Sequence, residues 1–241
     1  MSVYRTCKGV WSRVAPQRVR RAIWIATPAP IKTLRTRALR SLERGAEHDE
    51  VYDAEYYEHI IEPAMAASAE AMSEAIVRDL APASVIDVGC GSGGLLAALR
   101  ERGVPGRGLE YAAAGIERCR GRGLEVEKFD IEADEPLGWR AEVAISTEVA
   151  EHLPASCADR FCDLLAGSAD TVVLTAATPG SGGTDHVNEQ PNDYWIEKFG
   201  ARGFAFDRVM TDDWRRRWRE AGVAGCFART VMIFRKDEQA K

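Results

Sequence analysis

A glycine-rich turn directly after an apolar run is the stretch of this sequence with the clearest chemical meaning. Residues Val85–Gly94 read VIDVGCGSGG, with four glycines in the last six positions. Because glycine has no Cβ, such a turn lets the backbone bend sharply and approach a ligand closely. The turn predicts a binding site for a nucleotide-type cofactor, and several cofactors use a loop of this kind.

Two cofactor classes fit the spacing of this turn. Three of its glycines have the GxGxxG spacing of dinucleotide-binding loops, and Glu110 follows about 20 residues later, where such loops have an acidic residue. Asp87, two positions before the first glycine, instead gives the pattern Asp-x-Gly-x-Gly-x-Gly, which ends at Gly93. With this pattern the sequence resembles the class I S-adenosylmethionine-dependent methyltransferases.

The resemblance extends from Val51 to Lys236 and implies S-adenosyl-L-methionine as the cofactor. In that family the acid of the first strand and the glycine turn lie against the methionyl end of the cofactor, whose charged groups suit a carboxylate and backbone N–H groups. Glu110 matches the ribose-binding acid, and Asp130 matches the carboxylate beside the adenine. The cofactor-binding residues implied in this way are Asp87, Gly89, Cys90, Gly91, Gly93, Glu110, Tyr111, Asp130, Ile131, Thr147 and Glu148.

Some of these residues also have a purely structural interpretation. Glu110 could cap the helix that follows it, since acidic residues are favoured at helix starts. Cys90 is expected to be a small residue packed against the backbone rather than a nucleophile, because no base is paired with it in the sequence. His152 is expected one turn into the helix after the fourth strand, beside Glu151, where it mainly packs that helix.

Two tyrosines ahead of the first core helix are further candidates. Tyr56 and Tyr57 belong to the stretch YDAEYYEHI. Members of the family often lay such a segment over the bound cofactor as a lid. We therefore expect Tyr56 or Tyr57 to touch the cofactor.

A polar loop after the fifth strand lies where the family places the substrate. It runs from Thr178 to Trp195 and reads TPGSGGTDHVNEQPNDYW. Methyl transfer needs alignment of the acceptor and removal of its proton, and a histidine oriented by a carboxylate is the usual base for a hydroxyl. We predict His186 as the base, with Asp185 or Glu189 orienting it. Two alternatives stay open: a histidine that only holds the loop, or a divalent metal held by these three residues.

The acceptor is expected to be a hydroxyl on a small polar molecule, saccharide or secondary metabolite, although an amine or a carboxylate also fits. The Asn/Asp-Pro-Pro-aromatic run used to methylate nucleic-acid amino groups is absent, because Ser146–Val149 reads STEV. The net charge of −5 also disfavours a nucleic-acid partner. Two other function classes remain open: a nicotinamide-dependent oxidoreductase, and a non-catalytic binding protein with the methyltransferase fold.

The rest of the chain predicts an α/β fold that would position these residues. After Pro82, apolar strand-like segments alternate with helical ones, as in βαβ units. The segments FAFDR and RTVMIFRK near the end suit a closing hairpin with an antiparallel last strand. We predict a Rossmann-like, doubly wound, seven-stranded and mostly parallel sheet with an N-terminal helical extension.

Three regions are predicted: a basic helical arm at 1–50, a helical lid at 51–80 and the methyltransferase domain at 81–241. The arm has no acidic residue before Glu43, and it could pack on the domain or a partner subunit, touch an anionic membrane or glycan, or be an organelle transit peptide. The six cysteines lack disulfide or zinc spacing. With no run long enough to span a bilayer, a cytoplasmic protein is expected.

Overall fold

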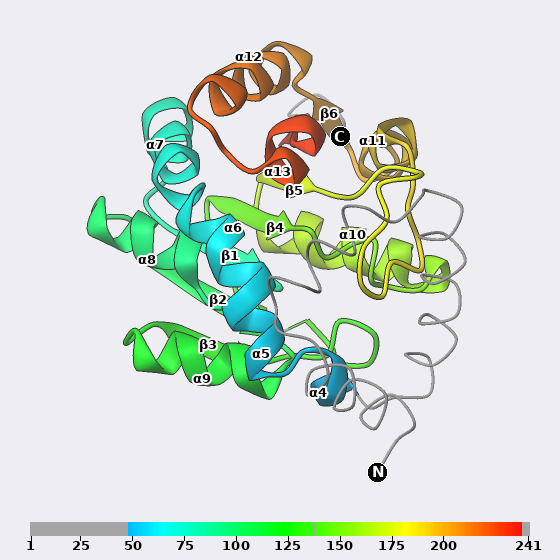
Figure 1. Ribbon diagram of the computed structural model, residues 1–241. Helices are drawn as coiled ribbons and strands as arrows, with labels where there is room; N and C mark the ends of the chain where they lie inside the picture. Colours follow the sequence, from blue (N-terminus) through cyan, green and yellow to red (C-terminus); the bar gives the residue numbers. More distant parts are fainter. Residues whose placement is uncertain (1–47, 137, 238–241) are drawn as a thin grey trace.

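The computed structural model describes residues 48–136 and 138–237, so the predicted arm lies almost wholly outside the described residues. One seven-stranded sheet in the order β3-β2-β1-β4-β5-β7-β6 runs through this part of the chain (Figure 1). β1 to β5 pair in parallel, whereas β7 is antiparallel to both β5 and β6. The strands are β1 (Val85–Val88), β2 (Gly106–Glu110), β3 (Glu125–Lys128), β4 (Val143–Thr147), β5 (Thr171–Thr175), β6 (Phe204–Phe206) and β7 (Met232–Lys236). The predicted fold class is confirmed, including the antiparallel last strand.

Helices cover both faces of the sheet, and each face has its own apolar core. Alternate residues of a strand enter different cores, because successive side chains point to opposite faces. In β4, Val143 and Ile145 join one core and Ala144 joins the other. The first core also takes residues from α6 (Glu62–Ala66), α7 (Ala69–Leu80), α8 (Gly94–Glu101), α9 (Ala113–Gly121), α12 (Arg208–Glu220) and α13 (Gly225–Thr230), and the second from α10 (Ala158–Ser168) and α11 (Asn192–Gly200).

A chain of short helices leads into the sheet at the N-terminal end of the described residues. It comprises α4 (His48–Val51), α5 (Ala54–Tyr56), the π-helix η1 (Tyr57–Ile61) and α6. Pro63 lies in the first turn of α6, where the missing N–H of proline is tolerated. Figure 1 shows α5 to α6 crossing diagonally in front of β1 and β2, from α4 towards α7.

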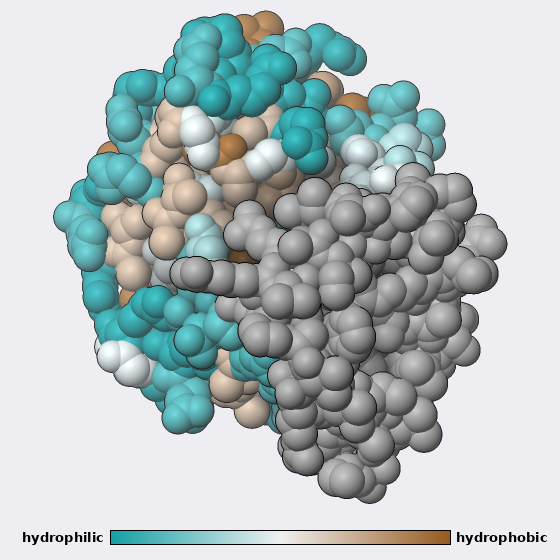
Figure 2. All heavy atoms as spheres, viewed as in Figure 1, coloured by the Kyte–Doolittle hydropathy of each residue, from teal (hydrophilic) through white to brown (hydrophobic). Residues whose placement is uncertain are grey.

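The C-terminal helices α12 and α13 pack into the first core, where α12 contacts α7. Trp214 and Trp218 of α12 are buried, and the indole N–H of Trp214 donates to a carboxylate oxygen of Asp79 at the end of α7, at 2.8 Å. Hydrophilic residues gather on the outer surface of α12 at the top of Figure 2. The short helix α13 was not predicted. Within the described residues, no helix combines the length and the apolar character needed to cross a membrane.

Candidate active site

The predicted glycine turn connects β1 to α8 and has a backbone that only glycine adopts easily. Gly89, Gly91 and Gly93 have φ values of 74°, 59° and 73°, in the left-handed region that L residues with a Cβ rarely occupy. A Cβ on Gly89 would lie 2.4 Å from Cγ2 of Val149. The turn therefore packs directly against the segment that follows β4, which brings the two predicted halves of the site together.

Asp87 lies in β1 beneath this turn and is buried. Its Oδ1 atom has no hydrogen-bond partner among the described residues, and burial, together with the nearby Glu110 carboxylate, raises the pKa of Asp87 to about 7. A buried carboxyl without a partner is unfavourable unless a donor or a positive charge meets it. The methionyl ammonium of S-adenosylmethionine is such a group, so Asp87 and the turn fit this cofactor.

Glu110 ends β2 and binds the chain's own backbone in this structure. One carboxylate oxygen accepts from the N–H of Gly91 at 2.7 Å, and the other accepts from Tyr111 and Ala112, both at 2.9 Å. The carboxylate thus fixes the turn that leads from β2 into α9 and joins it to the glycine turn. It does not cap the helix itself, whose first N–H, that of Ala113, donates to Asp49. Burial raises the pKa of Glu110, although these N–H groups work against that shift. Its role with the ribose stays a prediction.

The N-terminal helices cover the carboxyl ends of these strands, as a lid would. Tyr57 is buried, and its ring lies 3.9 Å from the Cβ position of Gly91. His48 stacks on Tyr52, with ring centroids 4.4 Å apart, and meets the edge of the Tyr111 ring at 4.6 Å. Tyr52 and His48 were not among the predicted site residues, because their contacts depend on how the lid folds back on the sheet.

The other predicted cofactor residues lie at or near the strand ends, and their roles stay predictions. Asp130 follows β3 and accepts from the N–H of Glu132 at 2.8 Å, which shapes the turn after the strand. Tyr56 is half-buried beside Tyr52, with ring centroids 5.1 Å apart. The remaining candidates line the carboxyl ends of the strands or the turn itself and are half-buried or buried: Ile131, Thr147 and Cys90.

Glu148 follows β4 with an unusual backbone conformation. Its φ is 55°, which is uncommon for a residue other than glycine and costs about 1 to 3 kcal/mol. Its N–H donates to the carbonyl oxygen of Thr175 at 3.1 Å and to the hydroxyl at 3.0 Å, and the Thr230 hydroxyl donates to its carboxylate at 3.4 Å. Burial raises the pKa of Glu148, although hydrogen bonds and the charge of His186 oppose the shift.

His186 and Glu189 form the pair predicted from the polar loop. Nδ1 of His186 lies 2.9 Å from Oε1 of Glu189, and the N–H groups of Gly180 and Gly182 donate to the same carboxylate at 2.8 and 2.7 Å. Burial favours a higher pKa for Glu189, but these hydrogen bonds lower it overall. Glu189 rather than Asp185 therefore orients the imidazole of His186, which is 9% exposed.

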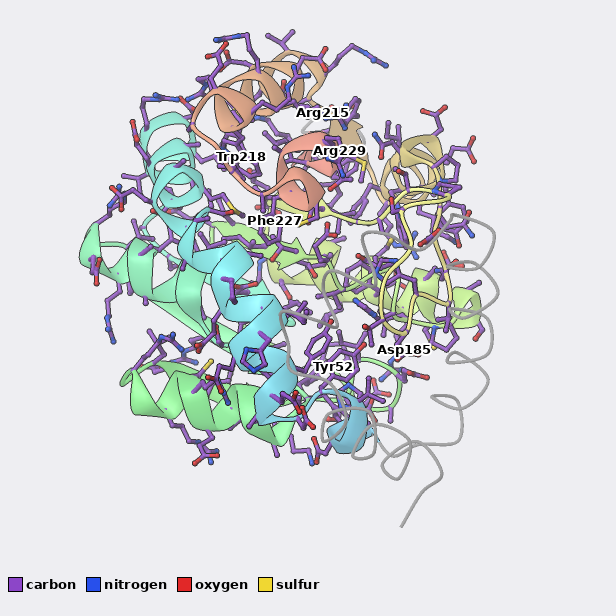
Figure 3. The ribbon with its side chains drawn as sticks, in the orientation of Figure 1. Tyr52, Asp185, Arg215, Trp218, Phe227 and Arg229 are labelled. Atoms are coloured by element: carbon purple, nitrogen blue, oxygen red, sulfur yellow. The ribbon has the colours of Figure 1, made fainter. Side chains whose placement is uncertain are left out.

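Asp185 instead faces the lid, as Figure 3 shows beside Tyr52. The Tyr52 hydroxyl lies 3.4 Å from Oδ2 of Asp185 and 3.0 Å from Nδ1 of His152. The same Nδ1 atom lies 3.2 Å from the carbonyl oxygen of Asp185. The lid and the polar loop are thus tied together through three polar groups.

His152 and Glu151 differ from their predicted setting. They lie in a turn before α10, which begins at Ala158, rather than within the helix. His152 does not serve helix packing, because its ring meets the ring of His186 edge-on with centroids 5.0 Å apart. Burial and the nearby His186 lower the pKa of His152 to about 3. The turn keeps both side chains at the carboxyl end of β4, on the acceptor side of the predicted site.

Glu151 is the buried acidic residue beside His152 and His186. Its side chain is fully buried, and neither carboxylate oxygen has a hydrogen-bond partner among the described residues. Burial and the neighbouring Glu148 carboxylate raise the pKa of Glu151 to about 9. Its backbone carbonyl accepts from Val187 and Asn188 at 2.9 and 3.0 Å, which anchors the polar loop. No sequence signal joined Glu151 to His186, because tertiary folding alone brings them together.

Comparisons with known proteins concern the fold and one segment of the chain. Residues 71–143 match the family model described as "Methionine biosynthesis protein MetW", while no curated protein matches the chain. An O-methyltransferase family protein from Burkholderia thailandensis has a TM-score of 0.59 and 16% identity, covering 81% of this chain and 62% of that one. A sugar N-methyltransferase from Streptoalloteichus has a TM-score of 0.55 and 17% identity, covering 72% and 88%.

A magnesium protoporphyrin IX methyltransferase from Synechocystis, with bound S-adenosylhomocysteine, has a TM-score of 0.50 and 18% identity, covering 62% of this chain and 80% of that one. At these identities the likeness concerns the fold. The predicted enzyme class and cofactor, a methyltransferase that uses S-adenosylmethionine, agree with the family match and with this neighbour's ligand. The chain has the fold of the class I S-adenosylmethionine-dependent methyltransferases, and the match to the MetW family model is confined to residues 71–143.

Proposed function

We propose that this methyltransferase methylates a hydroxyl group of a small polar molecule or saccharide, with removal of the hydroxyl proton dependent on His186. The observation that carries the proposal is the hydrogen-bonded pair of the buried His186 and the half-buried Glu189 in the polar loop. S-adenosylmethionine, when bound, supplies an electrophilic methyl group. The protein then has to align the acceptor oxygen and take away its proton.

The cofactor side of the proposal assigns one task to each strand end. Asp87 would meet the methionyl ammonium, and the backbone of the glycine turn would lie against the rest of the methionyl group. Glu110 would contact the ribose and Asp130 the adenine, while Tyr56 or Tyr57 would cover the cofactor from the lid. The unpartnered Oδ1 atom of Asp87 supports the first of these assignments.

On the acceptor side, Glu189 fixes the state of the imidazole. Because a carboxylate only accepts hydrogen bonds, Nδ1 of His186 carries the hydrogen and Nε2 keeps its lone pair. In the simplest form of the proposal this lone pair accepts the hydroxyl proton directly. Glu189 then stabilises the imidazolium that forms, as the orienting carboxylate does in other histidine bases.

The comparisons support a small polar acceptor. One similar structure is an O-methyltransferase family protein and another is a sugar N-methyltransferase. The first fits the proposed oxygen acceptor. The second makes an amino sugar the natural competitor for the hydroxyl, so the acceptor panel should contain both.

The proposal is tested by transfer of a labelled methyl group to a panel of sugars, nucleotide sugars, amino sugars and phenols. On the hydroxyl acceptor found, His186→Ala should lower turnover by about 10² to 10⁴-fold, the usual contribution of general base catalysis. The affinity for S-adenosylhomocysteine should stay unchanged, because the histidine lies on the acceptor side. His59→Ala serves as the matched control, since His59 is exposed on η1.

Near-normal turnover of His186→Ala would remove the residue from proton transfer. Methylation of amines only would show that the oxygen acceptor is wrong. Calorimetry with S-adenosylmethionine and NAD in parallel decides the cofactor, because a dinucleotide enzyme would bind NAD and leave S-adenosylmethionine unbound.

A further inference from the structure

Glu151, His152 and His186 bring three metal-binding side chains together at the acceptor side of the site. One ligand atom from each lies within 4.8 Å of the others. Donors bound to one ion at 2.0 to 2.2 Å lie at most about 4.4 Å apart. The three side chains are therefore within a few tenths of an ångström of the spacing that a single cation requires.

Both histidines are held by their Nδ1 atoms, so Nε2 is the nitrogen that could bind a ligand. In His186 this atom faces Gly183, where a Cβ would lie 2.2 Å from it. His186 donates through Nδ1 to the carboxylate of Glu189 at 2.9 Å. Nδ1 of His152 lies 3.0 Å from the Tyr52 hydroxyl and 3.2 Å from the carbonyl oxygen of Asp185. The carbonyl can only accept, and the Tyr52 hydroxyl can donate to Oδ2 of Asp185, so both contacts are satisfied when this nitrogen carries the hydrogen. Metal-binding histidines almost always donate their other N–H to a carboxylate or a backbone carbonyl in this way.

Glu151 supplies an independent indication that a positive ligand belongs here. Its carboxylate is fully buried, and among the described residues no donor lies at ordinary hydrogen-bond distance from either oxygen; its polar neighbours are the N–H of Ala177 and the side chain of Glu148. An isolated buried carboxylate is expensive, whereas one that coordinates a metal ion is compensated.

We propose that Glu151, His152 and His186 form a binding site for one divalent cation. Two imidazole nitrogens and one carboxylate favour a first-row transition ion such as Zn²⁺ or Mn²⁺ over Mg²⁺, which prefers oxygen ligands. Glu189 and the carbonyl of Asp185 position the two imidazoles and are not ligands. The metal alternative weighed from the sequence, with Asp185 and Glu189 as ligands, is thereby replaced by a different set.

This cation site rests on the proposed function for its chemical role. A divalent ion that binds the acceptor hydroxyl lowers the pKa of that hydroxyl, so its proton is lost to water at neutral pH. Nε2 of His186 cannot hold a cation and accept a proton at the same time. With the ion bound, turnover would depend on His186 as a ligand rather than as the base.

The site can be tested without acceptor or cofactor. The chelator-treated full chain is titrated with Mn²⁺ by electron paramagnetic resonance, which counts free ions, and with Zn²⁺ and Mg²⁺ by calorimetry. We expect one Mn²⁺ or Zn²⁺ ion per chain and much weaker binding of Mg²⁺. Glu151→Gln, His152→Asn and His186→Asn should each weaken ion binding more than about 100-fold, and Glu189→Gln by about 10 to 100-fold, as for groups that orient ligands.

Matched controls separate the site from nonspecific binding and from misfolding. His59→Asn and Glu117→Gln change exposed residues of the same types and should bind the ion as the wild type does. Unchanged affinity for S-adenosylhomocysteine shows that a variant is folded. If the fully buried Glu151→Gln variant fails to fold, His186→Asn in the loop still decides the question.

Absence of stoichiometric binding to the wild type, or equal binding by all three ligand variants, overturns the cation site. In either case, turnover that persists in chelator would leave the proposed methylation of a hydroxyl intact, with His186 as the base. Conversely, ion binding that requires the three residues, in a protein that methylates no hydroxyl, would support the cation site and reject the proposed acceptor.

Discussion

At the scale of single residues, Asp87 carries more of the cofactor argument than the glycines do. A glycine turn fits several nucleotides, whereas a buried carboxyl without a hydrogen-bond partner requires a particular kind of ligand. Burial raises the pKa of Asp87 to about 7, so without a ligand the group is largely protonated below neutral pH. A ligand ammonium would favour the ionised form and lower that pKa.

This linkage predicts a pH dependence of cofactor binding. The affinity for S-adenosylmethionine should rise with pH, by up to about tenfold per unit below pH 7, and level off above it, because Asp87 must lose a proton before it can pair with the ammonium. Calorimetry between pH 5.5 and 7.5 in two buffers would detect the released proton. Asp87→Asn should bind more weakly and lose this slope; a slope that persists in the variant would assign it to another group.

The same pKa affects the stability of the protein without cofactor. A carboxyl whose pKa is raised on folding stabilises the folded state below its unfolded pKa, near 4, and that contribution is lost as the pH rises through about 7. Asp87→Asn should therefore gain stability relative to the wild type as the pH rises. Chemical denaturation at pH 4.5 and 7.5 measures this difference, which bound S-adenosylhomocysteine should reduce.

The acceptor residues show what a sequence reveals of a site and what it hides. His186 and Glu189 are three positions apart in one polar loop, so their pairing could be predicted and their contact is present. Glu151 and His152 lie before α10, and no periodic pattern relates them to that loop. Two backbone hydrogen bonds from the loop to Glu151 bring the groups together, and such contacts are visible only after folding.

At the scale of elements, the alternation of strands and helices was predictable because each buried strand is a short apolar run bounded by turn residues. The irregular elements could not be predicted from the sequence. The helix α13 is only six residues long, and the π-helix η1 has no sequence signature of its own. Functional π-turns often interrupt regular helices, and η1 places the buried Tyr57 against the glycine turn.

Side-chain hydrogen bonds join the lid to the rest of the protein. Tyr52 joins it to His152 and Asp185, and Asp49 caps α9 by accepting from the N–H of Ala113 at 3.0 Å. Added S-adenosylhomocysteine should therefore protect residues 48–61 from amide hydrogen exchange, because a closed lid opens less often. Tyr52→Phe should reduce this protection. Protection confined to the glycine turn and strand ends would show that these helices serve packing alone.

At the scale of the whole molecule, the first core joins the lid to the C-terminal helices. It includes Met65 of α6 and Met72 of α7, together with Trp214 and Trp218 of α12. The segment that would cover the cofactor and the C-terminal helix α12 thus share one packed layer over the same face of the sheet. A substitution that disrupts the packing of α12 should therefore lower the free energy of unfolding of the whole domain, rather than unfold α12 alone.

Trp214→Ala tests this coupling. The side chain is fully buried and its indole N–H donates to Asp79, which also pairs with Arg217, so the truncation leaves both a cavity and a lost hydrogen bond. We expect a loss of about 3 to 5 kcal/mol in the free energy of unfolding, within a single transition that tryptophan fluorescence and circular dichroism report together.

Trp214→Phe keeps most of the packing and should cost about 1 to 2 kcal/mol. Trp139→Ala, at a half-buried residue, should cost less than the alanine variant at 214. Separate transitions would instead show that α7 and α12 unfold independently of the sheet.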